Sequence, residues 1–559
     1  MLKALFRKKH IATILADARQ QQEDGHSLNR VLTVRDLTFF GIAAIIGAGS
    51  FSSIGQACFE GGPGVIFLFI LCGIACGFTA LCYAEFASRI PVAGSAYTYA
   101  YASFGELLAW IIGWALLMEY SIGNIYVAFA WSGYFTNLLE AFHIHLPDYL
   151  TINYLAARDA FRASGAGETV YDAAGLAAWN TAPMLGNLRL ILDLPAVVIN
   201  VLITWLVFVG VRESRNVSNL MVWIKLTIIV LVIIVGAYYV DIDNWTPFMP
   251  NGFRGVMAGV AAVFFAYIGF DAVSTLAEES KNPQRDLPRG MIYSLVICTT
   301  VYIILSLVLT GMVPYTQLGI SDPLAEVFKL RGVKWIEFIV SISAVVAMTS
   351  VLLVFQMGQP RIWMSMSRDG LMPKAFQKIH PKYKTPSFST IVTGLVVGIP
   401  LLFTNEEFVL DFTSIGTLFA FVLVCGGVLL LPRKDREKGR FHLPYFNAKY
   451  TYTIMLLAGA LIVSIAQPGF FASLLDVTGP DAAHNIPLLI FCAVCVTMAV
   501  LAFKKNYSLI PLLGLTSCLY LLTGMEPSNW AWFFVWFLIG LIIYFMYGYK
   551  KSKLALRGQ

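Results

Sequence analysis

Long apolar runs recur along the chain and are separated by short polar or charged connections. Runs of about 17 to 25 residues are long enough to cross about 30 Å of hydrocarbon as a helix. Hydrophobic residues make up 58% of the chain and charged residues 13%, far from soluble composition. The sequence therefore predicts an all-α integral membrane protein with about 14 transmembrane helices. Their expected centres are residues 47, 76, 120, 199, 228, 266, 300, 347, 394, 419, 459, 494, 515 and 538.

The distribution of lysine and arginine predicts the orientation of these spans. With a cytoplasmic N-terminus, 31 of the 39 basic residues fall on the cytoplasmic side and seven on the other, while Lys225 lies within a span. This asymmetry follows the positive-inside rule, so both termini are expected in the cytoplasm. The net charge of +6 therefore requires no nucleic acid as a partner.

Soluble-type catalytic and metal-binding patterns are not apparent in the sequence. Cys492 and Cys495 form a CxxC inside an apolar span without a partner pair, which favours helix filling over a metal site. The seven histidines form no ligand cluster, and no nucleophile-elbow, zincin or phosphate-loop pattern occurs. We therefore expect no cofactor, no metal and no enzymatic activity.

The first span is interrupted at its middle by the run Gly47-Ala48-Gly49-Ser50. Glycine costs about 1 kcal/mol relative to alanine in a helix interior, and free backbone groups in hydrocarbon cost more. Such a run is tolerated where it lines a protected cavity, and the alternative is close packing of small residues between helices.

The sixth span carries a matching interruption, in which Gly269 is followed by the ionisable Asp271. Spans one and six are equivalent if spans one to five and six to ten are inverted repeats. Paired breaks of this kind point to the binding site of a transporter. The pair therefore favours a binding site over simple packing.

The two breaks suit opposite charges. A half-helix that begins near Ala48 to Ser50 offers N–H groups and a positive dipole end, which suits a carboxylate. A half-helix that ends near Phe265 to Ile268 offers carbonyl groups, which suit an ammonium. We therefore hypothesise that the substrate carries both groups on one carbon, as an α-amino acid does.

Two ionisable residues within the spans are candidates for proton coupling. Lys225 lies nine residues beyond Asn216 and hence roughly 14 Å along a helix, near the middle of the bilayer. Ionisable residues at this depth are costly and mark functional sites. Lys225 either takes and releases a proton or is a permanent ammonium held by carbonyls of the first helix. Glu119 in the third span either carries a proton or bonds neighbouring helices.

Other residues within the spans are candidates for the pocket and for a gate. Met348 in the eighth span either lines the pocket or fills the core. Asp271, Glu278 and Glu279 lie near the end of the sixth span, where we expect a solvated or ion-paired inner gate. Its basic partners are expected among the residues that follow, Lys281, Arg285 and Arg289.

Several long motifs carry a family resemblance, namely GIAAIIGAGSF, EGGPGVIFLFIL, ALCYAEFASRIPVAGSAYTYAYASFGELLAWIIGW, FFAYIGFDAVSTLAEESKNPQRDLPRG and PRIWMSMSRDGLMP. In this order they resemble the cationic amino acid transporter branch of the amino acid–polyamine–organocation superfamily, and the chain is similar to its bacterial members. The likeness runs from about residue 35 to residue 385, and more weakly through all the spans.

This resemblance implies a leucine-transporter-type fold with a 5+5 inverted repeat, alternating access and additional C-terminal helices. It implies that Lys225 stands where sodium-coupled relatives bind an ion, which favours protons over sodium. It also implies a multi-pass protein of the bacterial inner membrane that is in contact with lipids. Whether a small accessory membrane subunit binds to it is left open. The substrate contacts that it implies are Ile45, Ala48, Gly49, Ser50, Phe265 as an aromatic lid, Ala266, Ile268 and Met348.

The expected organisation begins with a cytoplasmic segment, 1–35, that contains an amphipathic helix. The two five-helix repeats span 36–240 and 241–432, with an outer loop over 140–188. Four peripheral helices at 450–548 and a cytoplasmic tail at 549–559 complete the chain.

The leading functional prediction is a secondary active transporter that takes up neutral, alanine-like L-amino acids together with protons. The apolar Met348 favours a neutral side chain. The alternatives are an exchanger of amino acids or polyamines, a transporter of cationic amino acids, and a membrane nutrient sensor.

Overall fold

The computed structural model describes residues 5–23, 30–47, 49–92, 94–166, 173–186, 188–320, 323–404, 406–431, 441–466, 468–475, 482–525 and 527–556. Within these residues the fold is helical apart from one short antiparallel hairpin, β1 (Met184–Leu185) and β2 (Leu188–Arg189). Ten described helical stretches are long and apolar enough to cross a membrane, and three further apolar helices are shorter. The predicted all-α membrane fold is confirmed.

The first half of the chain contains the helices of the expected first repeat. The expected centre at residue 47 falls in the break between α3 and the π-helical turn η1, and those at 76, 120, 199 and 228 fall on helices. The outer loop contains two helices, α8 and α9. The elements are α2 (Ile11–Glu23), α3 (Val34–Ile45), η1 (Gly49–Ser53), α4 (Ile54–Gly61), α5 (Val65–Arg89), α6 (Ala96–Ser103), α7 (Glu106–Ala141), α8 (Tyr154–Ala166), α9 (Ala173–Thr181), α10 (Leu194–Val209) and α11 (Val211–Tyr238).

The second half of the chain contains the helices of the expected second repeat, followed by the C-terminal helices. The expected centre at residue 266 falls in the break after α13, and the remaining eight centres fall on helices. The elements are α12 (Gly252–Ala258), α13 (Val260–Phe265), the 3₁₀-helix η5 (Phe270–Glu279), α14 (Pro283–Met312), α15 (Pro323–Leu330), α16 (Lys334–Arg368), α17 (Ser387–Gly398), α18 (Glu406–Leu430), α19 (Ala448–Ala466), α20 (Phe470–Leu474), α21 (Ala482–Lys505), α22 (Leu509–Leu522), α23 (Pro527–Ile543), the π-helical turn η9 (Tyr544–Gly548), α24 (Tyr549–Lys551) and α25 (Lys553–Leu556).

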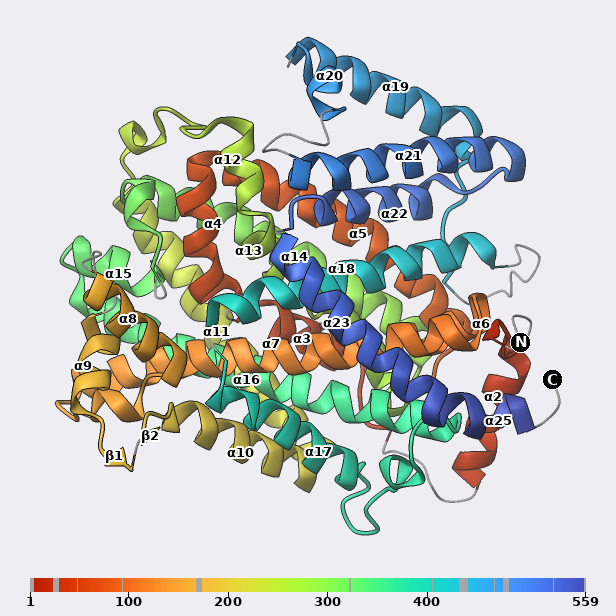
Figure 1. Cartoon of the computed structure of the whole chain (residues 1–559), viewed down its shortest axis with the longest axis horizontal. Helices are drawn as coiled ribbons and strands as arrows, with labels where there is room; N and C mark the ends of the chain where they lie inside the picture. The colour runs from red at the N-terminus through yellow and green to blue at the C-terminus, as the bar shows by residue number, and fades with distance from the viewer. Residues whose placement is uncertain are drawn as a thin grey trace.

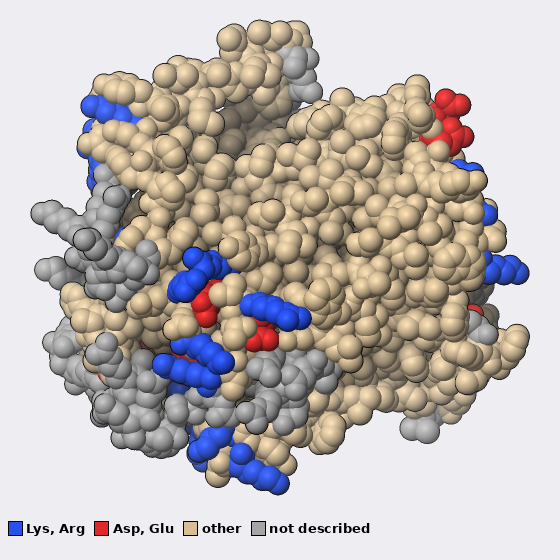
Figure 2. Space-filling view, turned by 180° about the vertical axis from the view of Figure 1, so that it is seen from behind, with Lys and Arg blue, Asp and Glu red and all other residues tan. Residues whose placement is uncertain are grey.

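The long helices run roughly along one direction, with α7 and α16 packed against each other through the middle (Figure 1). The N-terminal α2 and the C-terminal α25 lie at one end, which we call the terminal face, whereas α8, α9 and the hairpin lie at the opposite end (Figure 1). Figure 2 shows a wide uncharged surface, with charged side chains at the two ends of the view and in one group below and to the left of its centre. This surface suits contact with the hydrocarbon of a bilayer.

Local signals in the sequence explain where the first broken helix begins. The Asp36 carboxylate accepts hydrogen bonds from both the backbone N–H and the hydroxyl of Thr33, at 2.9 and 2.7 Å. These bonds satisfy the exposed start of α3 and place a negative charge at its positive dipole end. The start of α3 is therefore fixed locally, while its early end at Ile45 is not.

Candidate functional site

The first break leaves the carbonyl groups at the end of α3 without helical partners. α3 ends at Ile45, and the chain resumes as η1 at Gly49. The Gly47 carbonyl accepts the backbone N–H groups of Ser50 and Phe51, at 3.0 and 3.1 Å. The Ser50 hydroxyl donates to the same carbonyl at 3.1 Å. Ala48, a predicted carboxylate contact, lies outside the described residues.

Lys225 on α11 occupies the other side of this break and is fully buried. Its ammonium donates to the Ala43 carbonyl at 3.1 Å, to the Ile46 carbonyl, and to the Ser350 hydroxyl on α16 at 3.0 Å. A cation beside the C-terminal end of a helix is stabilised by the helix dipole. Lys225 thus joins three elements, α3, α11 and α16, at the predicted position beside the first break.

The second break lies between α13 and η5. After Phe265 the chain turns, with the Ile268 N–H donating to the Phe265 carbonyl at 3.1 Å. Gly269 then adopts a φ of +116°, a conformation that side chains with a Cβ rarely adopt. A Cβ on Gly269 would also lie 2.5 Å from the Cβ of Ala44, so this glycine allows η5 to approach α3.

The structure brings the two breaks into direct contact. A Cβ on Gly49 would lie 2.6 Å from the Cα atom of Ala266. The hydroxyl of Tyr302 on α14 lies within hydrogen-bonding distance of both the Ile45 carbonyl, at 2.7 Å, and the Ala266 carbonyl, at 2.9 Å. Ser53 also spans the contact, since its hydroxyl lies 3.1 Å from a carbonyl of each broken helix.

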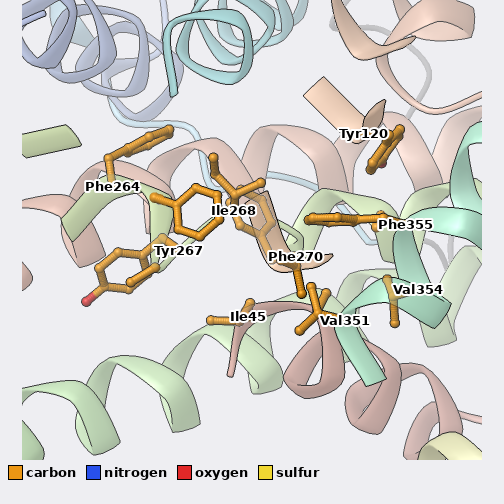
Figure 3. Close-up of a cluster of buried hydrophobic side chains, with 14 of the residues drawn as sticks. Ile45, Tyr120, Phe264, Tyr267, Ile268, Phe270, Val351, Val354 and Phe355 are labelled. Atoms are coloured by element: carbon orange, nitrogen blue, oxygen red, sulfur yellow. The ribbon is translucent and has the colours of Figure 1, made fainter. Parts of the chain in front are cut away.

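Apolar and aromatic side chains surround this contact. Ile45 and Val351 lie next to each other, with Ile268 and Phe270 across from them (Figure 3). The Phe265 ring meets the Tyr126 ring edge-on, with centroids 4.6 Å apart. A further predicted pocket residue, Met348, is fully buried on the face of α16 that also carries Val351 and Phe355.

Glu119 belongs to a different cluster from Lys225. It is fully buried on α7, where its electrostatic neighbours are Asp271 and the Thr417 hydroxyl. Within the described residues, neither carboxyl oxygen of Glu119 has a hydrogen-bond partner. Asp271 is equally buried and accepts a hydrogen bond from the Tyr120 hydroxyl at 3.2 Å.

Of the three acids expected in an inner gate, two are ion-paired, and the gate itself stays a prediction. Glu279 forms a buried ion pair with Arg361, and Glu278 pairs with Arg368 at 2.8 Å. The expectation for Asp271 is wrong, because this side chain points into the core instead of reaching water or a cation. The expected partners Lys281, Arg285 and Arg289 are replaced by arginines of α16, which packs against η5.

Sequence reasoning missed Tyr302 and Ser350, which complete the polar contacts of the breaks. Tyr302 stands in an ordinary apolar span, CTTVYIILS, where an aromatic residue carries no special signal. Ser350 follows Thr349 in a span with many small residues, so nothing singles it out. Their roles arise from the packing of α14 and α16 against the broken helices.

Comparisons with known proteins add independent information. The sequence pattern of the amino acid permease family matches residues 32–500, and that of the C-terminus of AA_permease matches residues 507–552. The branched-chain amino acid permease BcaP of Bacillus subtilis (strain 168) is 37% identical over 99% of this chain and 99% of its own length. The methylthioribose transporter of the same organism is 36% identical over 99% of this chain and 100% of its own. Cationic amino acid transporter 9, chloroplastic, of Arabidopsis thaliana is 35% identical over 97% and 92% of the two chains.

Proposed function

The chain belongs to the amino acid permease family, and from this membership and the geometry of its two breaks we propose that it imports neutral L-amino acids with protons by alternating access. In this proposal the carboxylate of the substrate binds at Gly49 and Ser50, and its ammonium binds at the carbonyls of the second break. The Tyr302 hydroxyl is hydrogen-bonded to one of these carbonyls, that of Ala266, until the substrate ammonium takes its place.

The observation that carries the proton coupling is the position of Lys225. A protonated lysine has three N–H donors, and the structure offers them three acceptors. A neutral amine has only two, so loss of the proton removes one of the three donated bonds by which Lys225 on α11 joins α3 to α16. Movement of α3 relative to α16 then becomes linked to protonation. Glu119, beside Asp271, is the second candidate for proton carriage, because buried carboxyl groups in membranes mark proton relays.

The apolar side chains at the breaks support a neutral substrate, from alanine upward in size. The name of BcaP, which refers to branched-chain amino acids, agrees with this choice. A cationic substrate is the second candidate, favoured by relatives named for cationic amino acids and by the buried carboxyl groups of Glu119 and Asp271.

We also propose a location in the bacterial inner membrane with the terminal face in the cytoplasm. The repeats in this proposal are residues 36–240 and 241–432, and the helices at 450–548 are peripheral. An accessory subunit is not needed for the mechanism. Labelling of single cysteines placed at residues 374 and 159, in intact cells, tests the orientation of the two ends.

The deciding experiment is uptake of labelled alanine and leucine into proteoliposomes. Empty vesicles should accumulate substrate when an inward proton gradient is imposed, and Lys225→Ala should lose this response. Lys329→Ala changes an exposed lysine and serves as the matched control. A strict requirement for internal amino acid identifies an exchanger, and binding without uptake identifies a sensor; either result contradicts the proposal.

A further inference from the structure

A cavity of about 70 Å³ lies between the core helices and the C-terminal helices, and its lining shares no residue with the two breaks. It is formed by the ends of α5 and α18, the segment 441–447 and the beginning of α22, toward the terminal face (Figure 1). A water needs about 10 to 15 Å³ of such space, so about five to seven water-sized groups fit. This size suits a phosphate group with a small substituent.

The walls of the cavity are firmly connected, so the space is built into the fold. The segment 441–447 is anchored to α5 by the Leu443 N–H, which donates to the Glu85 carboxylate at 2.7 Å. It is anchored to the C-terminal helices by the Leu509 N–H, which donates to the Phe446 carbonyl at 2.8 Å. A ligand in the cavity would therefore touch both the core and the C-terminal helices.

The lining has an apolar side and a polar side, as an amphipathic ligand requires. The polar side contains the ion pair of Arg89 with Glu85, at 2.6 Å, together with His442 and Ser508. The Ser508 hydroxyl oxygen is buried and has no hydrogen-bond partner among the described residues. The apolar side is made by Val428, Leu429, Leu431 and Pro511.

The surroundings of the cavity are positively charged. Lys504 and Lys505 are exposed at the end of α21, just before the lining residues Tyr507 and Ser508. Lys449, the second residue of α19, lies over the ring of Phe503 in α21. Among the described residues of the lining, Glu85 is the one acid, and its charge is matched by Arg89. The stretches 441–475 and 482–525 contain no aspartate or glutamate. Basic pockets between helices on one side of a membrane attract the headgroups of anionic lipids.

We propose that this cavity binds the phosphate of an anionic phospholipid, with the headgroup on the Arg89, Ser508 and lysine side and the acyl chains along the apolar side. The bound lipid links α5 and α18 to α22. A soluble phosphate ester presents the same anion without the chains, and the cavity's apolar side together with its place at the ends of membrane-spanning helices favours the lipid as the source.

The test uses the purified full-length protein in a neutral detergent, with thermal unfolding as the readout. Phosphatidylglycerol should raise the unfolding temperature, and phosphatidylcholine with the same chains and sn-glycerol 3-phosphate should have little effect. Lys504→Gln combined with Lys505→Gln should weaken the apparent affinity for phosphatidylglycerol about fivefold for each lysine removed. The control pair Lys374→Gln and Lys378→Gln removes two exposed lysines elsewhere and should change nothing.

A second experiment fills the cavity with a larger side chain and repeats the lipid measurement. Ser508→Leu places a larger apolar side chain in the lining and should weaken the apparent affinity for phosphatidylglycerol at least tenfold. Ser508→Ala should weaken this affinity less. Native unfolding temperatures and monodispersity without lipid show whether each variant is folded. Equal stabilisation by phosphatidylcholine, equal stabilisation by glycerol phosphate, or full lipid binding by a folded Ser508→Leu variant would each overturn the proposal.

Discussion

Gly49 lies so close to Ala266 that a methyl group on Gly49 would come within 2.6 Å of the Ala266 Cα atom. The partner atom belongs to the backbone and cannot rotate away, so Gly49→Ala must separate the two breaks. We expect uptake to fall at least tenfold and stability to fall by about 1–3 kcal/mol, the usual cost of overpacking. Proteoliposome uptake and thermal unfolding measure the two effects. Gly77→Ala is the control, because a Cβ there meets nothing within 4 Å.

Tyr302→Phe should destabilise the protein without changing its apolar packing. The variant removes the one hydroxyl that lies between the Ile45 and Ala266 carbonyls. Loss of a buried partner costs about 1–3 kcal/mol, which should appear as a lower unfolding temperature. Tyr83→Phe is a matched control, because the Tyr83 hydroxyl has no hydrogen-bond partner among the described residues. Equal effects of the two variants would show that the bridge contributes nothing.

Glu279→Gln should be strongly destabilising. Glu279 and Arg361 have exposed side-chain fractions of 0% and 1%, so the substitution leaves an unpaired guanidinium in the core. Breaking a buried ion pair from one side costs about 3–5 kcal/mol. Glu326→Gln breaks the exposed pair with Lys329 and should cost at most about 1 kcal/mol. The unfolding of the two variants is measured under the same conditions. Similar losses of stability would contradict a strong contribution of the buried ion pair between Glu279 and Arg361.

Glu119→Gln and Asp271→Asn should separate proton coupling from substrate movement. If these carboxyl groups carry protons, uptake driven by a proton gradient should fall at least tenfold in each variant. Exchange of labelled for unlabelled substrate at equal pH on both sides should fall less. Glu140→Gln changes an exposed acid on the same helix, α7, and should leave both activities intact. If uptake keeps its full response to the proton gradient in both variants, neither Glu119 nor Asp271 carries the coupled proton.

Asp193 should make stability depend on pH. Burial raises the pKa of this carboxyl, one residue before α10, to about 7, although bonds from the Ser132 hydroxyl and the Ala196 N–H lower it. Because the folded pKa lies above the unfolded value of about 4, the stabilisation is complete below about pH 4 and is lost as the pH rises through about 7.

The unfolding temperature should therefore fall between about pH 4 and about pH 7 and level off above it, and Asp193→Asn should reduce this fall. Asparagine retains an oxygen that can accept the N–H of Ala196, so the start of α10 is preserved. Asp243→Asn, at an exposed position, is the control. An unchanged pH profile in Asp193→Asn would assign the dependence to another group.

The spans and the two breaks could be predicted because their causes are local. A long apolar run in lipid has few options besides a helix, and glycines at residues 47, 49 and 269 weaken a helix wherever they occur. Lys225 and Glu119 could be singled out for the same reason, since a charged side chain inside an apolar run is conspicuous. Met348 also proved to be buried, although its role in the pocket stays a prediction.

The partners of these residues could not be predicted, because a partner depends on how distant helices are rotated and offset against each other. Tyr302 reaches both breaks only because α14 packs against α3 and η5 with this face inward. Asp271 illustrates the same limit: its position near the end of a span indicated a gate, but the turn at Gly269 directs it toward Tyr120.

Residue type and hydrophobicity along the chain are enough to predict that it crosses a membrane many times as helices, and that two of these helices are interrupted at glycines. The reason is that free backbone groups and charges in hydrocarbon cost free energy, and this cost acts on each segment separately. Three contacts follow only from the packing of the folded chain: Gly49 lies against Ala266, Lys225 joins α3 to α16, and Arg361 forms an ion pair with Glu279. These contacts join residues far apart in the chain, and only the packing of whole helices fixes distances of 3 Å between them.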